Sequence, residues 1–153
     1  MMFKYKASLF FLFIFAGVIL FFSLWMAFRP VKIVAVHVDH HCSDILVRNF
    51  PFIDQGKIKW WLENKSILKE KYNIPRPDSN GTFMVVFWIF GNGYKESDGY
   101  DSLCFNDMNV PKNCIEKRRV FSVETGRNGS ILFTSGDAVY RMDKKGKIVK
   151  RKN

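Results

Sequence analysis

The stretch Ala7-Ser-Leu-Phe-Phe-Leu-Phe-Ile-Phe-Ala-Gly-Val-Ile-Leu-Phe-Phe-Ser-Leu-Trp-Met-Ala-Phe28 decides the architecture of this chain. It contains 22 residues, seven of them phenylalanine, and no charged side chain. A helix of this length rises about 33 Å, enough to cross a bilayer core of about 30 Å. A core helix of a small domain would show a polar face, and a cleaved signal peptide would have a shorter apolar run. The sequence therefore predicts an uncleaved transmembrane helix over residues 7–28.

Positive charges flank this helix almost equally on its two sides. Lys4 and Lys6 precede it, whereas Arg29 and Lys32 follow it. The free amino group adds positive charge to the first side, and a cysteine pair further along the chain suits an oxidising compartment. We therefore expect residues 1–6 to be a cytoplasmic tail and residues 29–153 to be a single exported domain.

The exported part is strongly basic, with 22 Lys and Arg against 14 Asp and Glu. In the cytoplasm such a charge would suggest nucleic acid as the partner. On the far side of a membrane it indicates anionic lipid, cell-wall polymer or an acidic protein instead. We expect membrane lipid to contact residues 7–28, a protein to bind the domain, and nucleic acid to play no part.

The pattern of the exported part predicts an α+β domain, a small antiparallel sheet with one main helix. Residues 31–39 are rich in β-branched side chains and predict a strand that follows the membrane almost without a linker. Residues 43–53 fit a short helix or a strand. Apolar spacings of three and four predict one main helix over Lys57–Tyr72, with Asp54 as its N-cap. The unbroken apolar run Thr82–Phe90 predicts a central strand buried on both faces.

The last third of the domain is polar and rich in turns, which predicts an antiparallel meander. Turn residues at 127–129, 135–137 and 144–146 separate its short apolar runs. The strands expected from these runs are Arg119–Glu124, Ser130–Thr134, Ala138–Met142 and Lys147–Lys150.

Cys104 and Cys114 enclose nine residues, a spacing that suits a disulfide across a small loop in an oxidising compartment. The alternative is two unrelated thiols. Cys42 is then the odd cysteine, either buried, free or bonded to another chain.

All three histidines lie in His37-Val-Asp-His-His-Cys42. If the strand continues this far, His37, Asp39 and His41 share one face and are candidates for a metal site. The plainer interpretation is a polar strand end. Phosphate-binding loops, nucleophile elbows and zinc-protease motifs are missing from the sequence, so we expect no enzyme, no cofactor and no catalytic residue.

Five stretches make the chain similar to an uncharacterised family of enterobacterial membrane proteins, a domain of unknown function. The resemblance implies an inner-membrane anchor with a periplasmic domain, and it supplies no activity and no catalytic residues. His40-His41-Cys42 is not part of the pattern. The stretches are Arg29-Pro-Val-x-Ile-Val-Ala-Val-His37, Ser43-Asp-Ile-Leu-Val-x-Asn-Phe-Pro-Phe52, Lys57-Ile-x-Trp-Trp61, Leu103-Cys-Phe-Asn-Asp-Met108 and Asn113-Cys-Ile-Glu-Lys117.

We favour a non-enzymatic module that binds a protein, because a small anchored domain without catalytic motifs fits that role; immunity against a toxin acting in the envelope would need this layout. The alternative is a metal-dependent or hydrolytic envelope protein that uses the segment His37–Asp44. The expected partner-binding residues are aromatic and charged side chains beside the main helix and the acidic loop: Trp60, Tyr94, Asp98, Tyr100 and Asp101.

Overall fold

The computed structural model describes residues 2–152 and separates the chain after Pro30 into two compact units. The first unit is helix α1 (Met2–Ala27), and its side chains are exposed throughout. It is long and apolar enough to cross a membrane. The helix predicted over residues 7–28 is therefore present, and it begins five residues earlier than expected.

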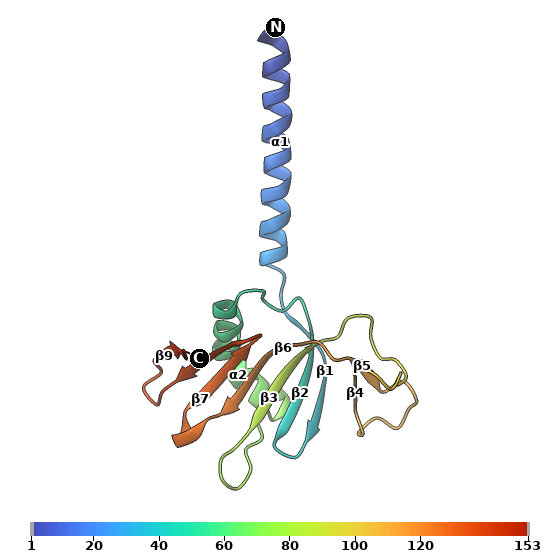
Figure 1. Cartoon of the computed structure of the whole chain (residues 1–153), viewed down its shortest axis with the longest axis vertical. Coiled ribbons are helices and arrows are strands. Elements are labelled where there is room, and N and C mark those ends of the chain that lie inside the picture. Colours follow the sequence, from blue (N-terminus) through green and yellow to red (C-terminus); the bar gives the residue numbers. More distant parts are fainter. Residues whose placement is uncertain (1, 153) are drawn as a thin grey trace. The chain divides into compact units, whose positions relative to one another are not determined.

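The second unit is an α+β domain built on one seven-stranded sheet (Figure 1). The strand order is β1-β2-β3-β6-β7-β8-β9, so β3 lies inside the sheet and β1 and β9 form its edges. The bounds are β1 (Lys32–Asp39), β2 (Cys42–Arg48), β3 (Met84–Ile89), β6 (Arg119–Thr125), β7 (Ile131–Ser135), β8 (Ala138–Met142) and β9 (Ile148–Lys150).

One pairing departs from the antiparallel sheet that we expected. β2 and β3 run parallel, because the chain crosses from one to the other through helix α2 (Asp54–Tyr72). Parallel neighbours need such a crossover, whereas antiparallel ones can be joined by a tight turn. The ambiguous residues 43–53 thus divide into a strand up to Arg48 and a connecting loop. The prediction that Asp54 is the N-cap is wrong, because Ile53 holds that position and Asp54 begins the helix.

The main apolar core lies between the sheet and α2. Phe87 on β3 is fully buried, and its ring centroid lies 4.9 Å from that of Phe50 and 5.7 Å from that of Phe121. Trp61 on α2 packs edge-on against the same Phe87 ring at 6.2 Å. Burying a side chain of this size contributes about 1.5–3 kcal/mol. Many of the aromatic residues of the domain therefore belong to its core.

A second apolar cluster covers the opposite face of β2 and β3. It is completed by the disulfide segment, which we define as residues 91–118, with the short strands β4 (Ser102–Cys104) and β5 (Cys114–Glu116). Phe105 and Ile115 from this segment pack against Leu46, Val86 and Trp88 of the sheet. Since Val85 and Phe87 face α2 while Val86 and Trp88 face the disulfide segment, the prediction that β3 is buried on both faces is confirmed.

The C-terminal meander β6–β9 is also confirmed. Its turns contain residues with positive φ, namely Asn128 at 61°, Gly136 at 56° and Gly146 at 83°. This conformation suits glycine and asparagine, which is why those turns were recognisable from the sequence. The turn at Arg127–Gly129 is a short 3₁₀ element, η1.

Candidate functional site

A polar cluster joins the edge strand β1 to the disulfide segment, and we call it the His37 cluster: His37, Tyr94, Phe105 and Asp107. His37 is 8 % exposed, and its Nδ1 lies 2.9 and 2.8 Å from the two carboxylate oxygens of Asp107. Its Nε2 lies 2.8 Å from the Tyr94 hydroxyl. The imidazole also stacks on the Phe105 ring with centroids 3.8 Å apart. Both ring nitrogens and one ring face are therefore occupied.

The fold explains why these side chains meet. His37 pairs with Asp44 across the β1–β2 ladder, and Asp44 in turn lies beside Val86 on the face that the disulfide segment covers. An ionised Asp107 can only accept, so the Nδ1–H of His37 donates the hydrogen bond to it. In the neutral ring Nε2 is then the acceptor for the Tyr94 hydroxyl.

Burial shifts the pKa of one group in the His37 cluster and of one group beside it. Burial and, second, the nearby Asp107 carboxylate raise the pKa of the Tyr94 hydroxyl, so the tyrosinate is disfavoured. Burial also raises the pKa of Asp44, although Trp88 donates its Nε1–H to Asp44 Oδ1 at 2.7 Å.

The structure does not place the candidate metal ligands His37, Asp39 and His41 on one strand face. β1 ends at Asp39, and His40 and His41 lie in the turn to β2, with His40 at a φ of 53°. His41 therefore does not share a strand face with His37, as the longer strand would require. Across residues 2–152, no group of three His, Cys, Asp or Glu side chains is placed to hold a metal ion.

The cysteines divide as expected into a pair and an odd residue. Cys104 and Cys114 lie opposite each other on β4 and β5, with their sulfur atoms at disulfide distance, 2.09 Å. Cys42 carries a free thiol that is half-buried, and burial together with the nearby Asp44 carboxylate raises its pKa. A raised pKa lowers the thiolate population on which thiol reactivity depends.

The five expected partner-binding residues are not brought into one surface. Trp60 lies on the α2 side of the sheet, edge-on to Phe50 and Phe87 at 5.5 and 5.7 Å. Tyr94 lies on the other side, in the His37 cluster. The remaining three, Asp98, Tyr100 and Asp101, are exposed and lie in the acidic loop, residues 96–101.

Side chains within and beside the acidic loop hold it in a defined conformation. Lys95 Nζ contacts Asp98 Oδ2 at 2.8 Å. The other oxygen of Asp98 accepts from the Ser102 hydroxyl at 2.7 Å and from the Tyr100 backbone N–H at 3.1 Å. The Lys95 ammonium, followed by these two donors, holds the pKa of Asp98 well below its usual range. Tyr100 itself is 88 % exposed, so this held loop presents a free aromatic ring to solvent.

One known protein family matches nearly the whole chain. Residues 3–152 match a family described as "Enterobacterial putative membrane protein (DUF943)". The chain belongs to this family. No curated protein matches it, and neither does any solved structure. The resemblance noted from the sequence is thus confirmed, and the DUF943 description supplies a membrane protein without an assigned activity.

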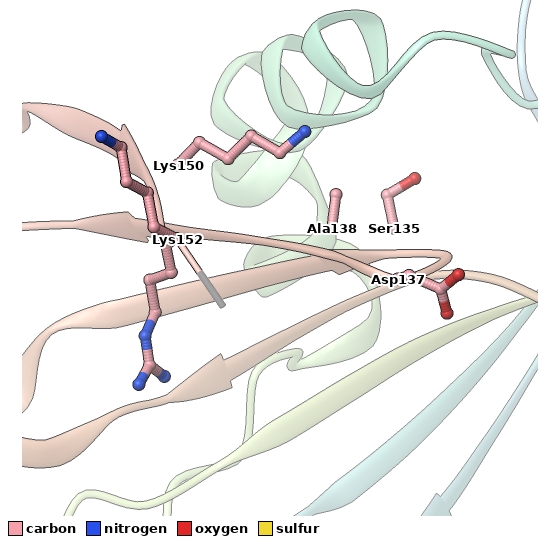
Figure 2. Close-up of a pocket in the computed structure, with 6 residues that line it drawn as sticks. Ser135, Asp137, Ala138, Lys150 and Lys152 are labelled. Atoms are coloured by element: carbon pink, nitrogen blue, oxygen red, sulfur yellow. The ribbon is translucent and has the colours of Figure 1, made fainter.

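A second polar region of this DUF943 protein surrounds the start of α2, and no sequence pattern predicted it. Lys57 is buried, and its Nζ donates to the Ser135 hydroxyl at 2.8 Å and the Val120 carbonyl at 3.1 Å. The Tyr140 hydroxyl donates to Asp54 at 2.7 Å. Next to these contacts is a pocket, in which Lys150 extends toward α2 (Figure 2). Its lining is Ser135, Asp137, Ala138, Lys150, Arg151 and Lys152.

Asp107 is the member of the His37 cluster that sequence reasoning missed. It is 70 residues from His37 and lies in a polar loop, where no local periodicity marks it. The one feature of the sequence that pointed to Asp107 was its position between Cys104 and Cys114. A loop closed by a disulfide is held in place, so its residues contact the part of the sheet that it covers.

Proposed function

We propose that this protein is a single-pass inner-membrane protein whose domain, residues 29–153, lies in the periplasm and binds a protein partner without catalysing a reaction. Residues 7–28, most of helix α1, are the anchor, and residues 1–6 are the cytoplasmic tail. The observation that carries the proposal is Tyr100, which is 88 % exposed on a loop that is held by side-chain contacts and backed by the Cys104–Cys114 pair.

A held loop with an exposed tyrosine has the properties of a binding surface. Tyrosine is enriched among the residues that dominate binding energy, because it offers a large contact area with few rotatable bonds. A loop that is already ordered loses less conformational entropy when a partner binds. The internal contacts of Asp98 therefore favour binding by keeping Tyr100 in place.

The charge of the loop indicates the chemistry of the partner. Glu96, Asp98 and Asp101 lie within six residues, on a domain that is basic as a whole. One of these carboxylates is paired with Lys95, which leaves Glu96 and Asp101 available. We therefore expect a basic surface on the partner, which would meet these charges around Tyr100.

Two features support binding in preference to catalysis. His37 has both nitrogens engaged within the protein, so a substrate would have to displace the Tyr94 hydroxyl to reach Nε2. The Tyr94 hydroxyl has its pKa raised, which disfavours its use as a nucleophile. Immunity against a toxin that acts in the envelope is one role that a small, anchored, non-catalytic binder of this kind could fill.

The decisive experiment is co-purification of the full-length protein from its native envelope after mild crosslinking, followed by mass spectrometry. We expect one partner in near-equal amount and at least a tenfold lower yield with Tyr100→Ala. Ile67→Ala is the control, because Ile67 is an exposed apolar side chain on α2, away from the acidic loop. Equal partner yield from Tyr100→Ala and from the unchanged protein would refute the assignment of this surface.

The orientation is tested separately with Ser79→Cys, an exposed turn position, in a Cys42→Ser background. A maleimide that cannot cross the inner membrane should label this cysteine in cells whose outer membrane alone is permeable. Labelling that appears only after the inner membrane is lysed would place the domain in the cytoplasm.

A further inference from the structure

The sheet register gathers several chain segments at the end of the domain where β1 begins, which we call the proximal end. Lys32 at the start of β1 pairs with Arg48 at the end of β2. Trp88 near the end of β3 pairs with Arg119 at the start of β6. Arg151 donates its backbone N–H to the Val139 carbonyl at the start of β8. The loop after β2, the start of α2 and the C-terminal residues after β9 therefore lie at this one end.

Covalent connectivity ties the proximal end to the predicted membrane helix. Helix α1 ends at Ala27 and β1 begins at Lys32, so five peptide steps join them. Five steps extend over about 17 Å at most. With α1 in a bilayer, the start of β1 cannot lie far from the lipid headgroups.

The loop between β2 and α2 presents two large apolar side chains at this end. Phe52 is 81 % exposed and Ile53 is 69 % exposed, directly after Pro51. Phe50, just before them, is buried against Phe87, so the loop is anchored while its tip is free. Adjacent exposed Phe and Ile side chains in a short loop are suited to insertion into the interfacial region of a membrane.

Basic side chains surround this apolar tip. Lys150, Arg151 and Lys152 are consecutive and exposed, and Lys150 pairs with Tyr140. The Tyr140 hydroxyl reaches Asp54, the residue after Ile53, which places the two features side by side. Two carboxylates lie among them, Asp54 and Asp137, and the first already accepts from Tyr140. Helix α2 also begins here, and its partial positive charge adds to that of the side chains.

We propose that the Pro51–Ile53 loop and Lys150–Lys152 form a docking surface for an anionic lipid bilayer. The loop tip inserts among the headgroups, and the three cations bind lipid phosphates in and around the pocket lined by Ser135 and Ala138 (Figure 2). An apolar tip beside consecutive basic residues combines the two attractions that hold proteins on membranes. The short linker favours lipid over a soluble partner, because it keeps this end within reach of the surface.

The test uses the full-length protein in vesicles of phosphatidylcholine, with or without phosphatidylglycerol. A fluorophore is attached to the new cysteine of a Phe52→Cys variant, in a Cys42→Ser background that removes the free thiol. Nitroxide-labelled lipid quenches the fluorophore when position 52 lies in the membrane. Ser79→Cys is the control position, because its turn precedes β3 at the opposite end of the sheet. We expect at least twofold stronger quenching at position 52 than at 79, and weaker quenching at 52 without phosphatidylglycerol or in high salt.

Two triple variants with the same change in net charge separate local docking from general attraction. Lys150→Gln, Arg151→Gln and Lys152→Gln should weaken docking about fivefold for each charge removed. Lys144→Gln, Lys145→Gln and Lys147→Gln alter the turn between β8 and β9 at the opposite end and should leave quenching unchanged. The proposal would be overturned by equal quenching at positions 52 and 79. It would also be overturned if quenching at position 52 did not depend on phosphatidylglycerol, or if the two triple variants lost quenching equally.

Discussion

His37 on β1 and Asp107 in the disulfide segment are 70 residues apart in the sequence, and their side chains lie 2.8 Å apart in the structure. Together with Tyr94 they add polar contacts to the apolar packing of Phe105 and Ile115 against the sheet. The disulfide segment, and the acidic loop within it, is therefore held against the edge strand by directional bonds as well as by burial.

The contribution of the Tyr94 hydroxyl can be measured by Tyr94→Phe, which removes its bond to His37 and keeps the ring. We expect the free energy of unfolding to fall by about 1 kcal/mol, the usual worth of a partly buried hydrogen bond. Chemical denaturation of the full-length protein in detergent is the measurement. Tyr100→Phe is the control, because that ring is exposed, and it should change stability by less than about 0.5 kcal/mol. Equal effects of the two changes would show that the Tyr94 bond adds nothing.

The Cys104–Cys114 pair should contribute through the chain entropy of the unfolded state. Closing a loop of this size is worth about 2.5–3 kcal/mol on the loop-entropy estimate. We expect Cys104→Ser with Cys114→Ser to lower the free energy of unfolding by about that amount, and reductant to do the same to the unchanged protein. Cys42→Ser should have little effect in either condition, because Cys42 is a free, half-buried thiol. A double variant as stable as the unchanged protein would contradict the prediction.

Local patterns predicted most of the fold because each rests on contacts between near neighbours. The apolar run of α1, the spacing of Ile58, Trp61 and Leu68 on α2, and the glycines of the C-terminal turns are all readable from short windows. The uniform apolar character of β3 indicated burial on two faces, and the structure shows what covers each face.

The missed features depend on contacts between distant residues. The parallel pairing of β2 with β3 follows from the path of α2, which residues 43–53 do not reveal by themselves. Lys57 looked like one of many solvated lysines, yet it reaches Ser135, 78 residues away. Trp60 looked like a surface aromatic, but its place above Phe87 depends on how α2 crosses the sheet.

Substitutions at a buried and at an exposed phenylalanine, Phe87 and Phe52, should have very different effects on stability. Phe87→Ala removes the ring that contacts Phe50, Trp61 and Phe121, so we expect a loss of about 3–5 kcal/mol. Phe52→Ala changes an exposed ring and should cost less than about 0.5 kcal/mol. Thermal and denaturant unfolding in detergent would measure both. A large loss from Phe52→Ala would mean that the loop tip supports the fold instead of contacting a membrane.

The last prediction concerns pH and rests on Asp44. Burial raises the pKa of this carboxyl, so the folded state binds its proton at a higher pH than the unfolded state does. A group with a raised pKa contributes stability that is complete below its unfolded pKa and is lost as the pH rises through its folded pKa. At neutral pH the charged Asp44 therefore costs stability, although Trp88 Nε1–H offsets part of that cost.

Replacing Asp44 with asparagine removes the charge and keeps an oxygen that can accept from Trp88. We expect Asp44→Asn to be more stable than the unchanged protein at neutral pH, and the difference to close in acid as the carboxyl of the unchanged protein becomes protonated. The free energy of unfolding measured against pH tests both parts. Asp137→Asn, an exposed position, should show neither effect. An Asp44→Asn variant that is less stable at neutral pH would mean that Trp88 and the nearby His37 stabilise the carboxylate by more than burial destabilises it.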